Sequence, residues 1–230
     1  MPFILSRKID AQTPPLWKEG APYERTSIYD GCAPDARSDV PPVHYDAHTL
    51  RPHSLAHADA PAHIIHGGRT IDTFFETKGP SPFWGPAVVV RFPQSIFEGQ
   101  VLRVTQAQLA AAVAAVTGER RPPNRILITA DAPQNWAMVL AQDAADWLTT
   151  NLDFVMYGTS WKSTDFMPVS RERPIHRTIL RQAVIFECLE LTQVPAGQYF
   201  WVGPPLPLVG ASESPACPLL FRPDELSWPE

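Results

Sequence analysis

The chain has 230 residues, of which 44% are hydrophobic and 19% are charged, and its formal net charge is −5 at pH 7. This composition can supply a sizeable core and excludes an intrinsically disordered class. The acidic balance and the lack of any block of basic residues argue against nucleic acid as a partner.

The sequence carries no sign of export or of membrane insertion. Residues Met1–Arg7 lack the basic start and the apolar run of a signal peptide, and no later apolar run could cross a bilayer. The three cysteines, Cys32, Cys188 and Cys217, are widely spaced and form no C-x-x-C pair. That usage is typical of a reducing compartment. We therefore expect a cytoplasmic protein without a membrane-spanning segment.

The first predicted element is an extended segment from His57 to His63. Pro61 disfavours helix at the preceding residue and removes a helical hydrogen-bond donor. Alternate side chains of an extended chain share a face, so His57, Asp59, Pro61 and His63 would line one side. Three alanines would pack on the other side. This pattern predicts a strand edge or a loop that lines a site.

Strands and helices then interleave along the chain. The predicted strands cover residues 85–93, 126–129, 154–157, 184–191 and 198–202, and the predicted helices cover 106–116, 141–150 and 174–181. Thr105 is a plausible N-cap for the first helix, which should stop at Gly118, and Pro174 suits the first position of the third. We expect an α/β fold in a single domain that spans residues 1–230.

Six of the seven histidines lie between His44 and His66. His57 and Asp59 are two residues apart on one face and can reach the same divalent ion, such as Zn²⁺ or Mn²⁺. His53 can join them only if the chain bends between Ser54 and Ala56 or forms a helical turn, and the sequence leaves both solutions open. The predicted ligands are therefore His53, His57 and Asp59. Three other members of the cluster, His44, His48 and His66, lack such support and are expected to be structural or exposed.

Three further residues are ambiguous when considered one at a time. Glu187 lies in an apolar strand, where a carboxylate is costly to bury unless it is paired or bound to a metal, but it could also face water from an edge strand. Trp17, in a proline-rich segment, could pack against the core or contact a ligand. His176, at the start of a helix, could equally be a surface residue.

The histidine segment resembles the signature of the cyclase family, which includes bacterial kynurenine formamidases. That signature, H-x-G-T-H-x-D-x-P-x-H followed by G-G-R-T-I, is similar to the run from His53 to His63 and to Gly67–Ile71. The strand at 85–90, the run His176–Leu180 and the run Phe186–Leu191 also resemble the family. The likeness extends over most of the chain.

The resemblance implies a swivelling α/β fold with a barrel-like mixed sheet, assembled as a homodimer or homotetramer. It also implies one or two bound metal ions. The resemblance implies that His53, His57 and Asp59 bind a first ion. Asp59, His176 and Glu187 would bind a second, with Glu187 shared between the two ions. His63 would be the general acid/base, and Trp17 would contact the substrate's aromatic ring.

Several positions depart from the family pattern. Leu55-Ala56 replaces Gly-Thr, and Lys18-Glu-Gly replaces Pro-Gly-Asp after the tryptophan. The segment Gly158–Asp165 lacks the first acid of the family's G-x-D-x-x-S-x-D. His176 and Glu187 are separated by one residue fewer than expected. Most of these departures are expected near the bound substrate.

Three hypotheses of function follow. The first is metal-dependent hydrolysis of a small aryl formamide such as N-formylkynurenine, with His63 moving the proton, because imidazoles exchange protons near neutral pH. The second keeps the metal site but changes the substrate to a cyclic amide such as isatin. The third is a non-catalytic protein that binds a metal or a ligand on the same scaffold.

Overall fold

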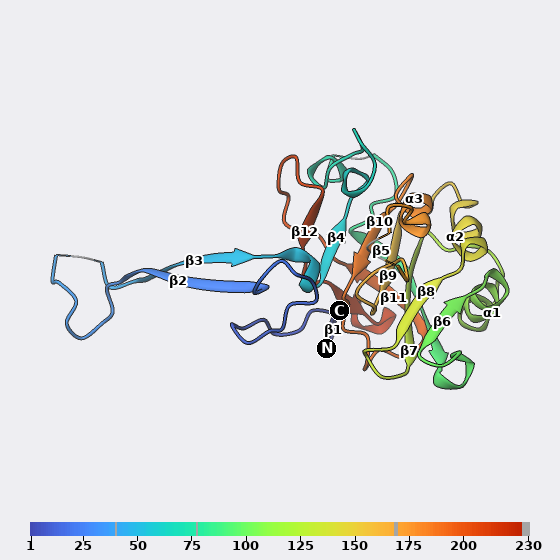
Figure 1. The fold of residues 1–230 in the computed structure, drawn as a ribbon, viewed down its shortest axis with the longest axis horizontal. Coiled ribbons are helices and arrows are strands. Elements are labelled where there is room, and N and C mark those ends of the chain that lie inside the picture. Colours follow the sequence, from blue (N-terminus) through green and yellow to red (C-terminus); the bar gives the residue numbers. More distant parts are fainter. Residues whose placement is uncertain (40, 77, 168–169, 227–230) are drawn as a thin grey trace.

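A computed structural model describes residues 1–39, 41–76, 78–167 and 170–226, and it is built around a curled nine-stranded sheet (Figure 1). In sheet order the strands are β1 (Phe3–Ile4), β13 (Leu219–Phe221), β11 (Gly197–Val202), β5 (Trp84–Pro93), β7 (Arg125–Asp131), β9 (Met156–Thr159), β10 (Val184–Glu187), β4 (His57–Asp59) and β12 (Glu213–Pro215). The central four strands, from β5 to β10, are parallel, and the outer ones pair antiparallel. The fold class is the predicted one, a mixed sheet flanked by helices.

The helices occupy the crossovers between the parallel strands, as parallel pairing requires. They are α1 (Gln106–Thr117), α2 (Gln142–Thr149) and α3 (Pro174–Ile179). The same crossovers contain a small separate sheet of two parallel strands, β6 (Val101–Val104) and β8 (Ala137–Leu140). Alternate residues of the central strands pack into two cores. The helix-side core includes Leu109 and Ile128, and the core on the opposite face includes Leu127 and Trp201.

The predicted helix signals are confirmed in detail for α1. The Thr105 side chain accepts from the Gln108 backbone while the Gln108 side chain accepts from Thr105, which forms a capping box. Gly118 ends the helix with a φ of 80°, a conformation that glycine adopts without steric cost.

Other predicted boundaries are wrong by a few residues. The strand predicted for 184–191 ends at Glu187 because Cys188 has a left-handed φ of 59°. The strand predicted at 154–157 begins only at Met156, and the helix predicted to Arg181 ends at Ile179. The strands β1, β6, β8, β12 and β13 were not predicted at all.

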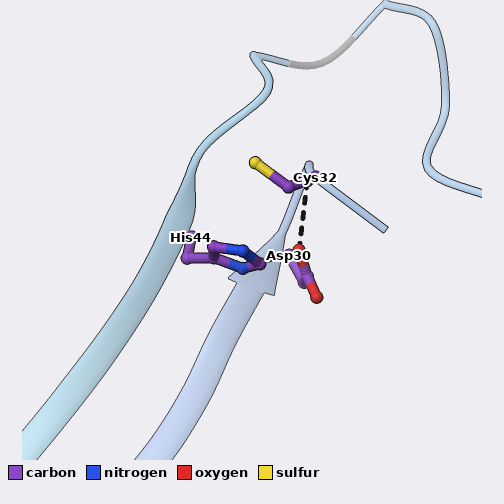
Figure 2. A group of neighbouring side chains, drawn as sticks. All are labelled: Asp30, Cys32 and His44. Carbon is purple, nitrogen blue, oxygen red and sulfur yellow. Dashed lines mark hydrogen bonds and ion pairs between the residues drawn. The ribbon is translucent and has the colours of Figure 1, made fainter. Parts of the chain in front are cut away.

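A long hairpin, β2 (Tyr23–Asp30) with β3 (His44–Leu50), extends away from the rest of the protein (Figure 1). Its strands are largely exposed. Near the loop that joins them lie Asp30, Cys32 and His44 (Figure 2). A carboxylate oxygen of Asp30 accepts from the Cys32 backbone N–H at 3.0 Å and lies 2.7 Å from Nδ1 of His44, so this exposed acid is satisfied by its neighbours.

The three histidines left outside the predicted site are exposed, as expected. They are His44, His48 and His66. Among the described residues, none of the helices combines the length and the apolar character needed to cross a membrane.

Candidate metal centre

The bend that His53 requires is a 3-10 turn over Pro52–Ser54. It brings Nδ1 of His53 to 3.3 Å from Nε2 of His57. The two open solutions, a kink in extended chain or a helical i,i+4 pair, are therefore resolved in favour of a short turn that feeds directly into β4. Trp17 contacts the same turn, because its indole N–H donates to the His53 carbonyl at 2.9 Å.

The extended prediction for residues 57–63 is correct for His57–Asp59 and wrong beyond it. Pro61 starts a second 3-10 turn, Pro61–His63, because its fixed φ suits a first helical position. The segment is not at a sheet edge either, since β4 lies between β10 and β12. All three residues of β4 are buried. Its polar side chains therefore project into an enclosed site.

The pairing of β4 with β10 puts Glu187 directly opposite His57. Oε2 of Glu187 lies 3.8 Å from Nε2 of His57. Glu187 is only 3% exposed, which contradicts the alternative of an edge-strand residue facing water. Its Oε1 accepts a hydrogen bond from the Thr164 backbone N–H.

His57 presents Nε2 to the other donors. Its Nδ1 lies 2.8 Å from the Leu55 carbonyl, which can only accept, so Nδ1 carries a proton and Nε2 is the nitrogen available to a metal ion. Nε2 lies 3.6 Å from Oδ1 of Asp59.

Asp59 carries the strongest indication that the site can hold a cation. Both of its carboxylate oxygens are buried without a hydrogen-bond partner. A buried carboxylate in that state is costly, and a bound metal ion would satisfy it. Donors that share one ion at about 2.1 Å lie about 3.4 Å apart in a tetrahedral arrangement. The separations among His53, His57 and Asp59 therefore fit a divalent metal.

A second donor set shares Asp59. Nε2 of His176 lies 3.9 Å from Oδ2 of Asp59 and 3.3 Å from Oε1 of Glu187. His176 is fully buried, which contradicts the alternative of a surface residue. The shortened link between His176 and Glu187 therefore still brings both side chains together.

Asp165 orients His176, a role that the sequence analysis missed. Its carboxylate accepts from the backbone N–H groups of Ile175 and His176 at 3.0 and 3.2 Å, and it lies 2.6 Å from Nδ1 of His176. The only signal was the acid that ends the segment Gly158–Asp165. That segment was expected near the substrate, whereas its final acid supports a donor.

The charges in the site are strongly coupled. Burial raises the pKa of Asp59, but the adjacent imidazoles of His57, His63 and His176 outweigh it and lower the pKa below its usual range. Burial opposes protonation of His57, but Asp59 raises the pKa of His57 well above its ordinary value. For His176 the carboxylates of Asp165 and Glu187 overcome burial and raise the pKa to about 9. The site therefore favours ionised carboxylates that attract positive charge.

His63 lies at the open side of these donors. Its Nδ1 is 3.9 Å from Oδ1 of Asp59 and 3.7 Å from Oε2 of Glu213. The side chain of His63 is 13% exposed, against 1% for Asp59. Glu213 comes from β12, at the sheet edge, and nothing in the sequence pointed to it.

Known proteins resemble this chain in sequence and in fold. The sequence model of the Cyclase family matches residues 3–165. The chain belongs to the cyclase family. Kynurenine formamidase from Polaromonas naphthalenivorans (strain CJ2) is 30% identical over 220 residues, 91% of this chain and 92% of the relative. Its counterpart from Paracidovorax citrulli (strain AAC00-1) is 30% identical over 227 residues, 90% and 97% of the two chains.

Solved structures show the same fold. Isatin hydrolase A from Labrenzia aggregata superposes with a TM-score of 0.75 at 17% identity and covers 96% of this chain and 93% of its own. Isatin hydrolase A from Ralstonia solanacearum has a TM-score of 0.72 at 22% identity, covering 96% and 92%. The predicted cyclase-family resemblance and the hydrolase class are confirmed by the family match and the relatives.

A cavity of about 360 Å³ is lined by residues next in sequence to the donors of this cyclase-family chain. Ser54, Leu55 and Ala56 lie between His53 and His57, and Cys188 follows Glu187. Lys162 lines the cavity as well. The departures from the family pattern at Leu55-Ala56 therefore line a cavity.

Proposed function

We propose that the chain hydrolyses a small aryl formamide such as N-formylkynurenine, releasing formate and the free amine with the help of a bound divalent ion, Zn²⁺ or Mn²⁺. The observation that carries the proposal is the buried carboxylate of Asp59, which has no hydrogen-bond partner and lies among the imidazoles of His57, His63 and His176. The relatives named kynurenine formamidase support the substrate class.

His53, His57 and Asp59 would hold the ion, and Asp59, His176 and Glu187 provide the second donor set. When bound, such an ion polarises the amide carbonyl and makes water a better nucleophile. The protein's own task is to hold the ion and to move the proton. The buried β4 strand and the hydrogen bond from Nδ1 of His57 to Leu55 fix the donors in advance.

His63 is the proposed proton carrier. Its Nδ1 faces the carboxylate of Glu213, whose pKa is lowered chiefly by its interaction with His63. That leaves Nε2 to take the proton from water and return it to the departing nitrogen. In the structure Arg173 donates to Nε2 at 3.1 Å, so this contact must give way to the attacking water.

The experiment that tests the proposal compares kcat/KM for N-formylkynurenine and isatin, before and after chelation. We expect the formamide to be the better substrate and chelation to abolish both activities, with recovery when metal is restored. Preference for isatin would favour the cyclic-amide hypothesis. That hypothesis is motivated by Leu55 and Ala56, which line the cavity and replace Gly-Thr of the family pattern. Stoichiometric metal without turnover on any amide would favour a binding protein.

Trp17 allows a test of the aromatic requirement. Its indole N–H donates to the His53 carbonyl, and Lys162 Nζ is 5.0 Å from the centroid of its ring. Loss of an aromatic contact costs about 1 kcal/mol beyond lost area, so Trp17→Ala should raise KM for an aryl formamide about tenfold. KM for an aliphatic formamide should change little. Equal losses on both substrates would contradict contact with the aromatic ring.

We also propose a homodimer or homotetramer, which sedimentation analysis of the purified protein would test.

A further inference from the structure

Arg173 occupies an unusual position at the start of α3. It is the residue before Pro174 and has a φ of 37°, in the left-handed region that residues other than glycine rarely adopt. A strained backbone of this kind persists only when its surroundings hold it in place, and it is often found at functional sites. The contacts of the side chain supply the reason here.

The guanidinium of Arg173 bridges two imidazoles of the site. Its Nη1 lies 3.1 Å from Nε2 of His63 and its Nη2 lies 2.9 Å from Nε2 of His176. A guanidinium can only donate, so each contact requires a lone pair on the imidazole nitrogen. Arg173 therefore contacts Nε2 of His176, the atom that the second donor set offers to a metal ion, and it also contacts His63.

The surroundings of these two nitrogens are those of a cation site. Nε2 of His176 is within 3.3 Å of Glu187 and 3.9 Å of Asp59, so positive charge beside it is attracted by two buried carboxylates. Asp59, His63 and His176 each offer an atom to a common point. The guanidinium and a second ion would thus compete for one place.

We propose that Arg173 takes the place of the second metal ion, so that this chain binds a single ion on His53, His57 and Asp59. The guanidinium supplies a positive charge beside His176, and its Nε, buried without a partner, remains available to an oxygen of a bound ligand. This inference rests on the proposed metal centre and is independent of which amide the enzyme cleaves.

The test is the metal content of the full chain after loading with Mn²⁺ and removal of free ion. We expect one ion per wild-type chain and two per Arg173→Gly chain. Glycine removes the guanidinium and also relieves the strain at a positive φ, so the variant should keep its fold. Arg181→Ala, at an exposed arginine just after α3, is the matched control and should bind one ion.

Electron paramagnetic resonance provides a second readout that does not depend on turnover. The wild-type chain should give the spectrum of an isolated Mn²⁺, and Arg173→Gly should give that of an exchange-coupled pair. Two ions in the wild type, or one in Arg173→Gly, would overturn the inference but leave the metal centre standing. The absence of any ion from both chains would overturn the metal centre as well, whereas inactivity on formamides would bear on the proposed function alone.

Discussion

Replacing His63 with alanine is expected to lower kcat about 10²- to 10⁴-fold, the usual contribution of a positioned general acid/base. Metal should stay bound, because the first donor set, His53, His57 and Asp59, does not include this residue. The side chain lies at the open end of the site with 13% exposure, so its removal leaves no closed cavity in either core. The effect should therefore fall on the chemical step.

The measurement is kcat and KM on N-formylkynurenine, together with the metal content of the same samples. His66→Ala is the matched control, since His66 is three residues further along the chain and is exposed. This variant should keep the kcat, KM and metal content of the wild type. Full turnover by His63→Ala would refute the proton-transfer role. Loss of metal together with activity would instead place His63 among the ligands.

The sequence was sufficient for the parts of the site that depend on local pattern. Proline and alternation along β4 correctly joined His57 to Asp59, and the apolar run around Glu187 pointed to a buried carboxylate but left open that it faced water. The same logic located the helix caps of α1. These inferences work because a side chain's neighbours two to four residues away decide its direction.

The rest of the site depends on contacts between segments distant in sequence, and the periodicity of apolar residues along the chain does not predict such contacts. Glu213 reaches His63 only because β12 pairs with β4, and β12 is too short to be recognised. Asp165 and Arg173 flank His176 from a loop with no periodic pattern. The hairpin of β2 and β3 has little apolar alternation because most of it is exposed, so its strands gave no signal.

Metal removal is expected to lower the melting temperature by on the order of 10 °C, an effect that Asp59→Asn should abolish. An ion present at a thousand times its dissociation constant stabilises the folded chain by about 4 kcal/mol. For a chain of this length each kcal/mol corresponds to roughly 2–4 °C. Asp59 belongs to both donor sets, and a neutral amide in its place cannot balance the ion's charge, so the variant should gain nothing from added metal.

The pH of this experiment matters because the pKa of Asp59 differs between the folded and unfolded states. Its pKa is lowered in the folded chain, so its ionised form adds stability above its ordinary value of 3.8, and this is lost as the pH falls. Near pH 7 that contribution is fully present in metal-free wild type, and the chelator-dependent shift then reports the ion alone. Asp153→Asn, at an exposed acid, should keep the full shift. An equal metal-dependent shift in Asp59→Asn would mean that binding of the ion does not depend on Asp59, and this would contradict the proposed metal centre.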